Sequence, residues 1–298
     1  MAPGVSKSGL FAKRPTLCLA PCSAGAGALG QPTAIAVPRP KHPPVNCQFN
    51  GSSPSLCGCS CPAGVDWKNV STGNRNVVED FRASWKRIIA LGNSSAAMAK
   101  GKTYQFDLVD ITRQVLTDHF NETLYQLSAA VVSAPIDRAK VSRITKELLA
   151  TIDDLDRILG THPSFMLGTW INEARSWGTT DAERDHYEWS ARNQITLWGP
   201  SGRQGTVDYA AKAWSGLTKT YYKPRWALYL QMLQASESGE VNQTAFNDAV
   251  LAQVEQPWQR MTAETQPFPS TPSEDPLAVA MQLFQKYGRN TATQTAVL

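Results

Sequence analysis

The stretch TYQFDLVDITRQVLTDHFNETLYQLSAAVV, residues 103–132, decides the fold class. Its apolar residues recur every three or four positions, which is the period of one face of an α-helix. The residues of this face are Leu108, Ile111, Val115, Leu116, Phe120, Leu124 and Leu127. We therefore expect one long helix whose apolar face is buried in a core.

The same period continues on both sides of this stretch. Before it, one stripe comprises Val78, Phe81, Trp85, Ile88 and Ile89, and after it another comprises Ile144, Leu148, Ile152, Leu155 and Leu159. Further helical patterns cover 164–177, 180–198, 206–236, 242–261 and 275–288. Thr180 and Glu183 have the spacing of a capping box, and Asp275-Pro276 is a typical helix start. Because no alternating strand pattern of useful length occurs, the sequence predicts an all-α fold, an irregular bundle of about eight helices.

Residues 1–75 differ from this helical body, which we assign to residues 76–298. They are rich in Pro, Gly, Ser and Cys, and they contain too little apolar surface to offset the entropy of ordering. We expect this segment to be disordered. All six cysteines lie in it, and a disulfide framework there would allow fifteen pairings. The spacing CxCxC at 57–61 does not favour a zinc site, and a secretory signal would have only a weak apolar region.

Composition excludes several classes of function. The first 60 residues carry five basic and no acidic side chains, which leaves 24 basic and 25 acidic side chains for the rest. A body so close to neutral has no electrostatic footprint for nucleic acid. No run of 18 apolar residues predicts a membrane span. There is no G-x-S-x-G motif and no phosphate-binding glycine loop, so we expect no cofactor.

Several polar groups could still bear chemistry, and each has a simpler structural interpretation. Glu183 and His186 form one ExxH, but a di-iron bundle needs two, so a solvated helix face is favoured over metal. The cluster of Asp107, Asp110 and Arg113 is typical of an ion-paired helix junction. The acidic stretch TIDDLDR, 151–157, with Asp153, Asp154 and Asp156 near Arg157, is interpreted as a solvated face.

The stretch ITLWGPSGRQGTVDYAAKAW, residues 195–214, is the best candidate for a binding site. Trp198 and Tyr209 flank a loop that can bend sharply at Gly199, Gly202 and Gly205. Aromatic rings offer flat apolar faces, and the tyrosine adds a hydroxyl, which suits a sugar. The alternative is that both rings cap the core.

Five sequons, at Asn50, Asn69, Asn93, Asn121 and Asn242, favour a glycoprotein of the secretory pathway, and we assign glycans to Asn93, Asn121 and Asn242.

Five strings then occur in one order and spacing: YQFDLVDITRQVL (104–116), FMLGTWINEARSW (165–177), YEWSARNQITLWGP (187–200), VDYAAKAWSGL (207–217) and YYKPRWALYL (221–230). Together they resemble the C-terminal helical domain of α-N-acetylglucosaminidases. These glycoside hydrolases remove terminal α-linked N-acetylglucosamine, as in heparan sulfate degradation. The resemblance runs from about Val77 to Tyr287.

In that family the catalytic glutamate pair lies on a (β/α)8 barrel, and the helical domain closes one wall of the sugar pocket. The resemblance places Trp198, Tyr209 and Thr206 at the wall and assigns Arg192 and Arg225 to structure. It implies a lysosomal, vacuolar or secreted enzyme. Since residues 1–76 have no room for a barrel, we expect a truncated chain that has no catalytic residue and is inactive alone. A catalytically inert helical interaction module is the alternative.

Overall fold

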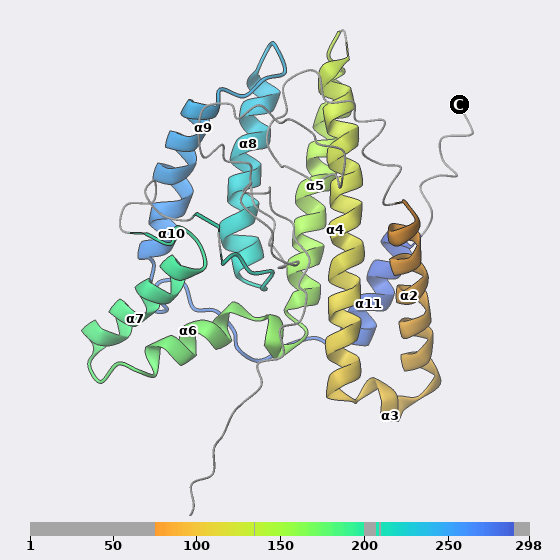
Figure 1. The fold of residues 1–298 in the computed structure, drawn as a ribbon, viewed down its shortest axis with the longest axis vertical. Helices are drawn as coiled ribbons and strands as arrows, with labels where there is room; N and C mark the ends of the chain where they lie inside the picture. The colour runs from red at the N-terminus through yellow and green to blue at the C-terminus, as the bar shows by residue number, and fades with distance from the viewer. Residues whose placement is uncertain (1–74, 134, 200–206, 209, 289–298) are drawn as a thin grey trace, which may run out of the picture.

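The computed structural model describes residues 75–133, 135–199, 207–208 and 210–288, and this part of the protein is helical, with no β-sheet (Figure 1). The predicted all-α class is confirmed. The α-helices are α2 (Arg75–Ser94), α3 (Ala96–Ala99), α4 (Lys102–Val132), α5 (Arg138–Leu159), α6 (Leu167–Arg175), α7 (Asp181–Gln194), α8 (Lys223–Ala235), α9 (Gln243–Val250), α10 (Gln256–Arg260) and α11 (Pro276–Tyr287). A 3-10 turn, η1 (Pro163–Phe165), and two π-helical turns, η2 (Thr218–Tyr222) and η3 (Leu251–Glu255), complete them.

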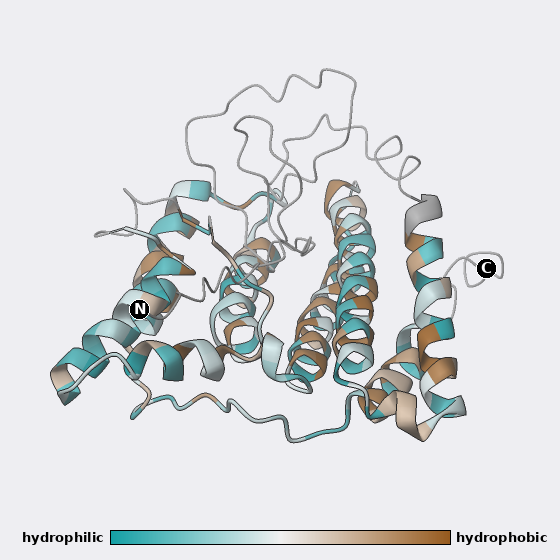
Figure 2. Cartoon of the chain, turned by 60° about the horizontal axis from the view of Figure 1, so that its bottom comes forward, coloured by the Kyte–Doolittle hydropathy of each residue, from teal (hydrophilic) through white to brown (hydrophobic). Residues whose placement is uncertain are grey.

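Helix α4 is the centre of the bundle, with α5 packed antiparallel along it (Figure 1). Helices α2 and α11 contact α4 on the other side, and α8 packs against α5. Apolar positions recur along α2 and α4 in Figure 2, as the sequence period predicts. Of the predicted α4 stripe, Leu108, Val115, Leu116, Phe120 and Leu127 are buried, and Ile111 and Leu124 are partly buried against the core.

Trp85 joins three of these helices at one point. Its side chain is fully buried, and its Nε1 donates a 2.8 Å hydrogen bond to Thr112 Oγ1 of α4. Its ring also meets that of Phe284 of α11 edge to face, with 5.1 Å between centroids. A buried indole needs a partner for its N–H, and the threonine hydroxyl supplies it.

The helix starts follow the predicted capping chemistry. Glu183 N donates to Thr180 Oγ1 at 3.2 Å while the Glu183 carboxylate accepts from Thr180 N, so the capping box is confirmed. Asp275 caps α11 by accepting from Ala278 N at 2.8 Å. These bonds satisfy N–H groups that have no partner inside the helix.

The prediction that the acidic stretch 151–157 is a solvated face holds only in part, because Asp153 keeps 44 % side-chain exposure while the carboxylates of this stretch have partners elsewhere in the chain. Asp153 pairs with Lys223 of α8 at 2.6 Å, and Asp154 pairs with Lys286 of α11. Asp156 accepts from the backbone N–H of Gly216 at 2.7 Å and of Lys219 at 3.0 Å. Three nearby carboxylates on α5 therefore fix three other parts of the chain, which a helical period alone cannot reveal.

A half-buried carboxylate, that of Asp118, also lies on the α4 side that faces α2. Asp118 accepts a 2.8 Å hydrogen bond from Gln114 Nε2, and the adjacent Glu122 pairs with Arg82 of α2 at 2.6 Å. Burial raises the pKa of Asp118 to about 7, against the lowering effect of the Gln114 hydrogen bond, and Glu122 adds to the increase. Arg82 and Arg113 oppose it, without overcoming the desolvation.

No helix among the described residues is both long and apolar enough to cross a membrane.

We predict that the domain becomes more stable as the pH falls from about 8 to about 5 through the titration of Asp118. Its folded pKa of about 7 exceeds the ordinary aspartate pKa of 3.8, so between these values the folded state binds a proton that the unfolded state lacks. This contribution to the stability is fully present below the unfolded pKa of 3.8, and it is lost as the pH rises through the folded pKa of about 7. Urea unfolding curves across this range measure the effect.

Asp118→Asn removes the titrating group and keeps an oxygen for Gln114. It should reduce the pH-dependent change in the free energy of unfolding by on the order of 2 kcal/mol. Asp80→Asn, at an exposed position on α2, serves as the matched control. An unchanged slope in Asp118→Asn would contradict the assignment.

Candidate functional site

The candidate site lies where the chain leaves α7, at Trp198. This side chain is 37 % exposed, so its ring reaches the surface of the described chain. Tyr209 and Thr206, which the sequence analysis placed beside it, lie outside the described residues. The site is therefore described from its two ends, 195–199 and 207–208.

Both ends have unusual backbone geometry. Trp198 and Asp208 have φ angles of 42° and 60°, and within the described residues no other non-glycine residue has a positive φ. Two hydrogen bonds of 2.7 Å connect these positions to the last turn of α7 and the residues directly after it: Trp198 N donates to Asn193 O, and Asp208 N donates to Thr196 O. The two ends of the connection therefore meet at one place, although ten positions separate them in sequence.

Arg225 of α8 holds Asp208, at the second end of the connection, in place. Its guanidinium is fully buried and donates to both carboxylate oxygens of Asp208, at 2.8 Å and 3.1 Å. Its Nε lies 3.1 Å from Glu255 Oε1 of η3, which is also fully buried. Burial by itself lowers the pKa of Arg225, but the charge of Asp208 raises it above its ordinary value. Arg225 is thus a cation held between two carboxylates.

Glu188 of α7 is the centre of a second buried ionic group. One carboxylate oxygen accepts from Arg192 at 2.6 Å and 2.8 Å. The other accepts from Arg175 of α6 at 2.8 Å and from Ala263 N at 2.9 Å. Burial lowers the pKa of Arg192, and the Glu188 hydrogen bond opposes that shift. The structural role expected for Arg192 and Arg225 agrees with these contacts.

An aromatic layer covers the two ionic groups. The Arg192 guanidinium lies 4.7 Å from the ring centroid of Trp258 and 5.2 Å from that of Phe268, which is the geometry of a cation–π contact. The Tyr221 ring lies 5.1 Å from Trp258 and 5.0 Å from the Arg225 guanidinium. The layer excludes water and so strengthens the ion pairs.

Two prolines explain how these residues come together. Pro224 follows η2, and Pro257 follows η3, each at the first turn of the next α-helix. Proline has no N–H and clashes with the carbonyl four residues before it, so the helix widens to a π turn at this point. The π turns contribute Tyr221 and Glu255 to the buried group. The strings YYKPRW and VEQPWQ carry this signal, which the helical period alone did not separate from an ordinary helix.

The other polar candidates have structural roles. The Glu183 carboxylate accepts from Thr179 Oγ1 at 2.6 Å as part of the helix cap, and His186 stacks on Trp189 at 6.0 Å. Arg113 donates to Asp110 at 2.7 Å, which confirms an ion pair in the predicted cluster. Across the described ranges, no three His, Cys, Asp or Glu side chains gather as a metal site would require.

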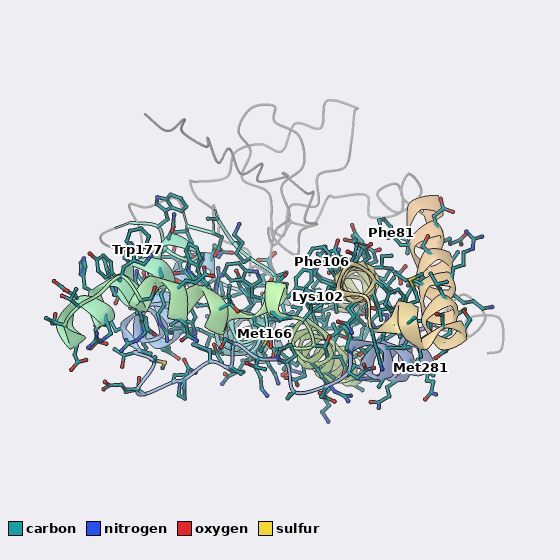
Figure 3. All side chains as sticks on the ribbon, turned by 90° about the horizontal axis from the view of Figure 1, so that it is seen from below. Phe81, Lys102, Phe106, Met166, Trp177 and Met281 are labelled. Atoms are coloured by element: carbon teal, nitrogen blue, oxygen red, sulfur yellow. The ribbon has the colours of Figure 1, made fainter. Side chains whose placement is uncertain are left out.

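A hollow of about 820 Å³ occurs at the start of α4, and its lining includes Lys102, Phe106, His162 and Glu274. It has no lining residue from 195–208. Phe106 and Trp177 are far apart in Figure 3, where Trp177 is at the end of the molecule opposite Phe81 and Met281. Trp198, which is 37 % exposed, does not line this hollow.

The model of the α-N-acetylglucosaminidase (NAGLU) C-terminal domain matches residues 55–286. The match begins ahead of residue 76, where the sequence analysis placed the domain start. Human α-N-acetylglucosaminidase is 31% identical over 221 residues. The aligned part makes up 70% of this chain and 27% of the human protein, so the chain spans about a quarter of that relative.

Solved structures show the same fold. CpGH89 from Clostridium perfringens, in complex with its substrate GlcNAc-α-1,4-galactose, has a TM-score of 0.59 and 22% identity over 90% of this chain and 28% of its own. A family 89 glycoside hydrolase from the same organism, in complex with 2-acetamido-1,2-dideoxynojirmycin, has a TM-score of 0.58 and 23% identity, over 88% and 27% of the two chains.

The buried cation predicts a large effect of one substitution. Arg225→Met should lower the free energy of unfolding by about 3–5 kcal/mol, because Asp208 and Glu255 would keep buried negative charge without their partner. Arg143→Met is the matched control, since the Arg143 side chain is 63% exposed and lies 3.8 Å from Glu147. It should cost less than about 1 kcal/mol. If urea unfolding gave the same loss of unfolding free energy for both variants, the buried ion pairs of Arg225 would stabilise the fold no more than an exposed pair does.

Proposed function

The chain belongs to the family of α-N-acetylglucosaminidase C-terminal domains, and we propose that it supplies one wall of the sugar pocket of such a glycoside hydrolase. The family match over residues 55–286 is the observation that carries this proposal. The exposed ring of Trp198, placed on a backbone fixed at both ends, supports the position of the wall. Tyr209 and Thr206 complete the wall in this proposal.

The proposed ligand is a terminal α-linked N-acetylglucosamine on a glycan of the heparan type. The complex of CpGH89 with GlcNAc-α-1,4-galactose supports this sugar as the class of ligand. An indole face packs against the C–H face of a pyranose, and polar groups at its edge select the hydroxyl pattern. One wall buries only part of a sugar, so we expect weak binding by this chain alone.

The catalytic glutamate pair belongs, in this proposal, to a barrel domain against which the helices pack. The chain spans 27% of the human relative, which leaves room for a barrel in a protein of that size. Large apolar side chains on the surface are suited to such a contact, among them Trp177 at 78%, Tyr187 at 40% and Met261 at 36% exposure.

A secretory-pathway location, lysosomal, vacuolar or extracellular, belongs to the same proposal. Asn93 and Asn242 are exposed, and Asn121 is partly buried on α4. Asn242 uses its side-chain oxygen to cap α9 through Ala245 N at 3.0 Å, which leaves its nitrogen for a glycan. Loss of mass on glycosidase treatment of secreted material would support the assignment of these three asparagines.

We predict that the purified chain does not release 4-nitrophenol from the aryl α-N-acetylglucosaminide. The proposed acid pair is on another domain, and hydrolysis needs two carboxyl groups about 5–5.5 Å apart for retention. Absorbance at high enzyme concentration measures this, with a complete enzyme of the family as the positive control. Turnover that survives further purification would refute the division of labour between the two domains.

We predict that Trp198→Ala weakens the binding of N-acetylglucosamine at least fivefold, because a lost stacking face is worth about 1 kcal/mol or more. Chemical-shift titration with millimolar sugar measures the dissociation constant. Trp177→Ala is the matched control, since it removes a more exposed indole at the other end of α7. Equal affinities of wild type and Trp198→Ala would exclude Trp198 from the sugar wall.

A further inference from the structure

Trp198 has a backbone conformation that its own side chain disfavours. Its φ of 42° is in the left-handed region, where a bulky residue is rare and glycine is common. Gly199 follows directly, so a turn that served only to end α7 could place glycine at the left-handed position instead. A strained residue persists where its surroundings determine it, and such residues gather at functional sites.

Asn193 supplies those surroundings with two acceptors. Its backbone oxygen accepts from Trp198 N at 2.7 Å, and its side-chain oxygen accepts from Gly199 N at 3.2 Å. Two consecutive N–H groups of the chain are therefore bound by a single residue of α7. Because these two bonds lie on either side of the Trp198 side chain, they fix the direction in which the ring leaves the backbone.

Gln259 of α10 fixes Asn193 in turn. Its Nε2 donates a 2.6 Å hydrogen bond to the same side-chain oxygen that accepts from Gly199. An amide oxygen has two lone pairs, so both bonds can form together. Gln259 is buried, with 7 % exposure, and lies next to Trp258 of the aromatic layer. The orientation of the Asn193 side chain is thus fixed by a buried residue of α10.

We propose that Asn193, held by Gln259, is a positioning residue that locks the Trp198 ring in the direction in which it meets a sugar. The identity of the ligand rests on the proposed function, but the lock itself does not. Asparagine fits this role because its short side chain accepts a hydrogen bond from Gly199 N. At the same time, its backbone carbonyl accepts one from Trp198 N. An alanine keeps the backbone acceptor and loses the side-chain one.

The experiment compares Asn193→Ala with Asn193→Asp, which retains an acceptor oxygen of the same reach. The chain is labelled with 5-fluorotryptophan, and Trp198→Phe assigns the fluorine signal of Trp198. In Asn193→Ala this signal should move toward the free indole position and sharpen, and the dissociation constant for N-acetylglucosamine should rise at least fivefold. Asn193→Asp should retain both wild-type values.

A merely structural cap would change the urea midpoint and leave the Trp198 signal in place, and that result would overturn the proposal. Asn247→Ala, which removes an amide bonded to Gln243 on α9, is the control for general destabilisation. If Asn193→Ala does not fold, Gln259→Leu tests the same lock from its other end and should give an intermediate shift. A shifted Trp198 signal without any binding of sugar by the wild type would refute the proposed function and uphold the lock.

Discussion

Two buried guanidinium groups, those of Arg192 and Arg225, constrain the half of the fold that bears the candidate site. Each is fully buried, and a buried charge is tolerated only when its partners surround it. Glu188 forms an ion pair with Arg192, and Asp208 and Glu255 form ion pairs with Arg225. The partners come from α7, from the end of the connection and from η3, so none of these parts can move without leaving a charge unpaired. The ionic groups determine position even where they add little net stability.

This constraint divides the domain into two kinds of interior. Around α4 and α5 the core consists mainly of the apolar side chains of the predicted stripes, and buried polar groups such as Thr112 and Arg113 have partners within it. Beneath Trp198 the interior is made of guanidinium groups, carboxylates and rings, which hold only in one arrangement. A sugar wall, as proposed, has to present its ring at a fixed angle, and the directional contacts of this ionic interior can hold that angle. The first kind supplies the stability on which the second depends.

The sequence predicted the apolar half well and the ionic half poorly, for a physical reason. A helical period follows from burial of one face, and the stripes of α4 and α5 are buried as expected. The contacts of Asp156 with Gly216 and Lys219 join residues about sixty positions apart, and no local pattern encodes them. The π turns before Pro224 and Pro257 shift the register of the helices, so a strict period misplaces Tyr221 and Glu255. Family resemblance, and not periodicity, singled out Arg192 and Arg225.

The position of Trp198 follows from where the rigid and the open parts of the chain meet. On its inner side, Asn193 and Gln259 connect it to α7 and α10. The hydrogen bond from Asp208 N to Thr196 O holds the two ends of the connection together. On its outer side the ring is 37 % exposed. In the proposed sugar wall, a ring whose orientation is fixed before a ligand arrives binds at a small entropic cost. The same proposal assigns the rest of the binding site to the barrel surface that faces this ring.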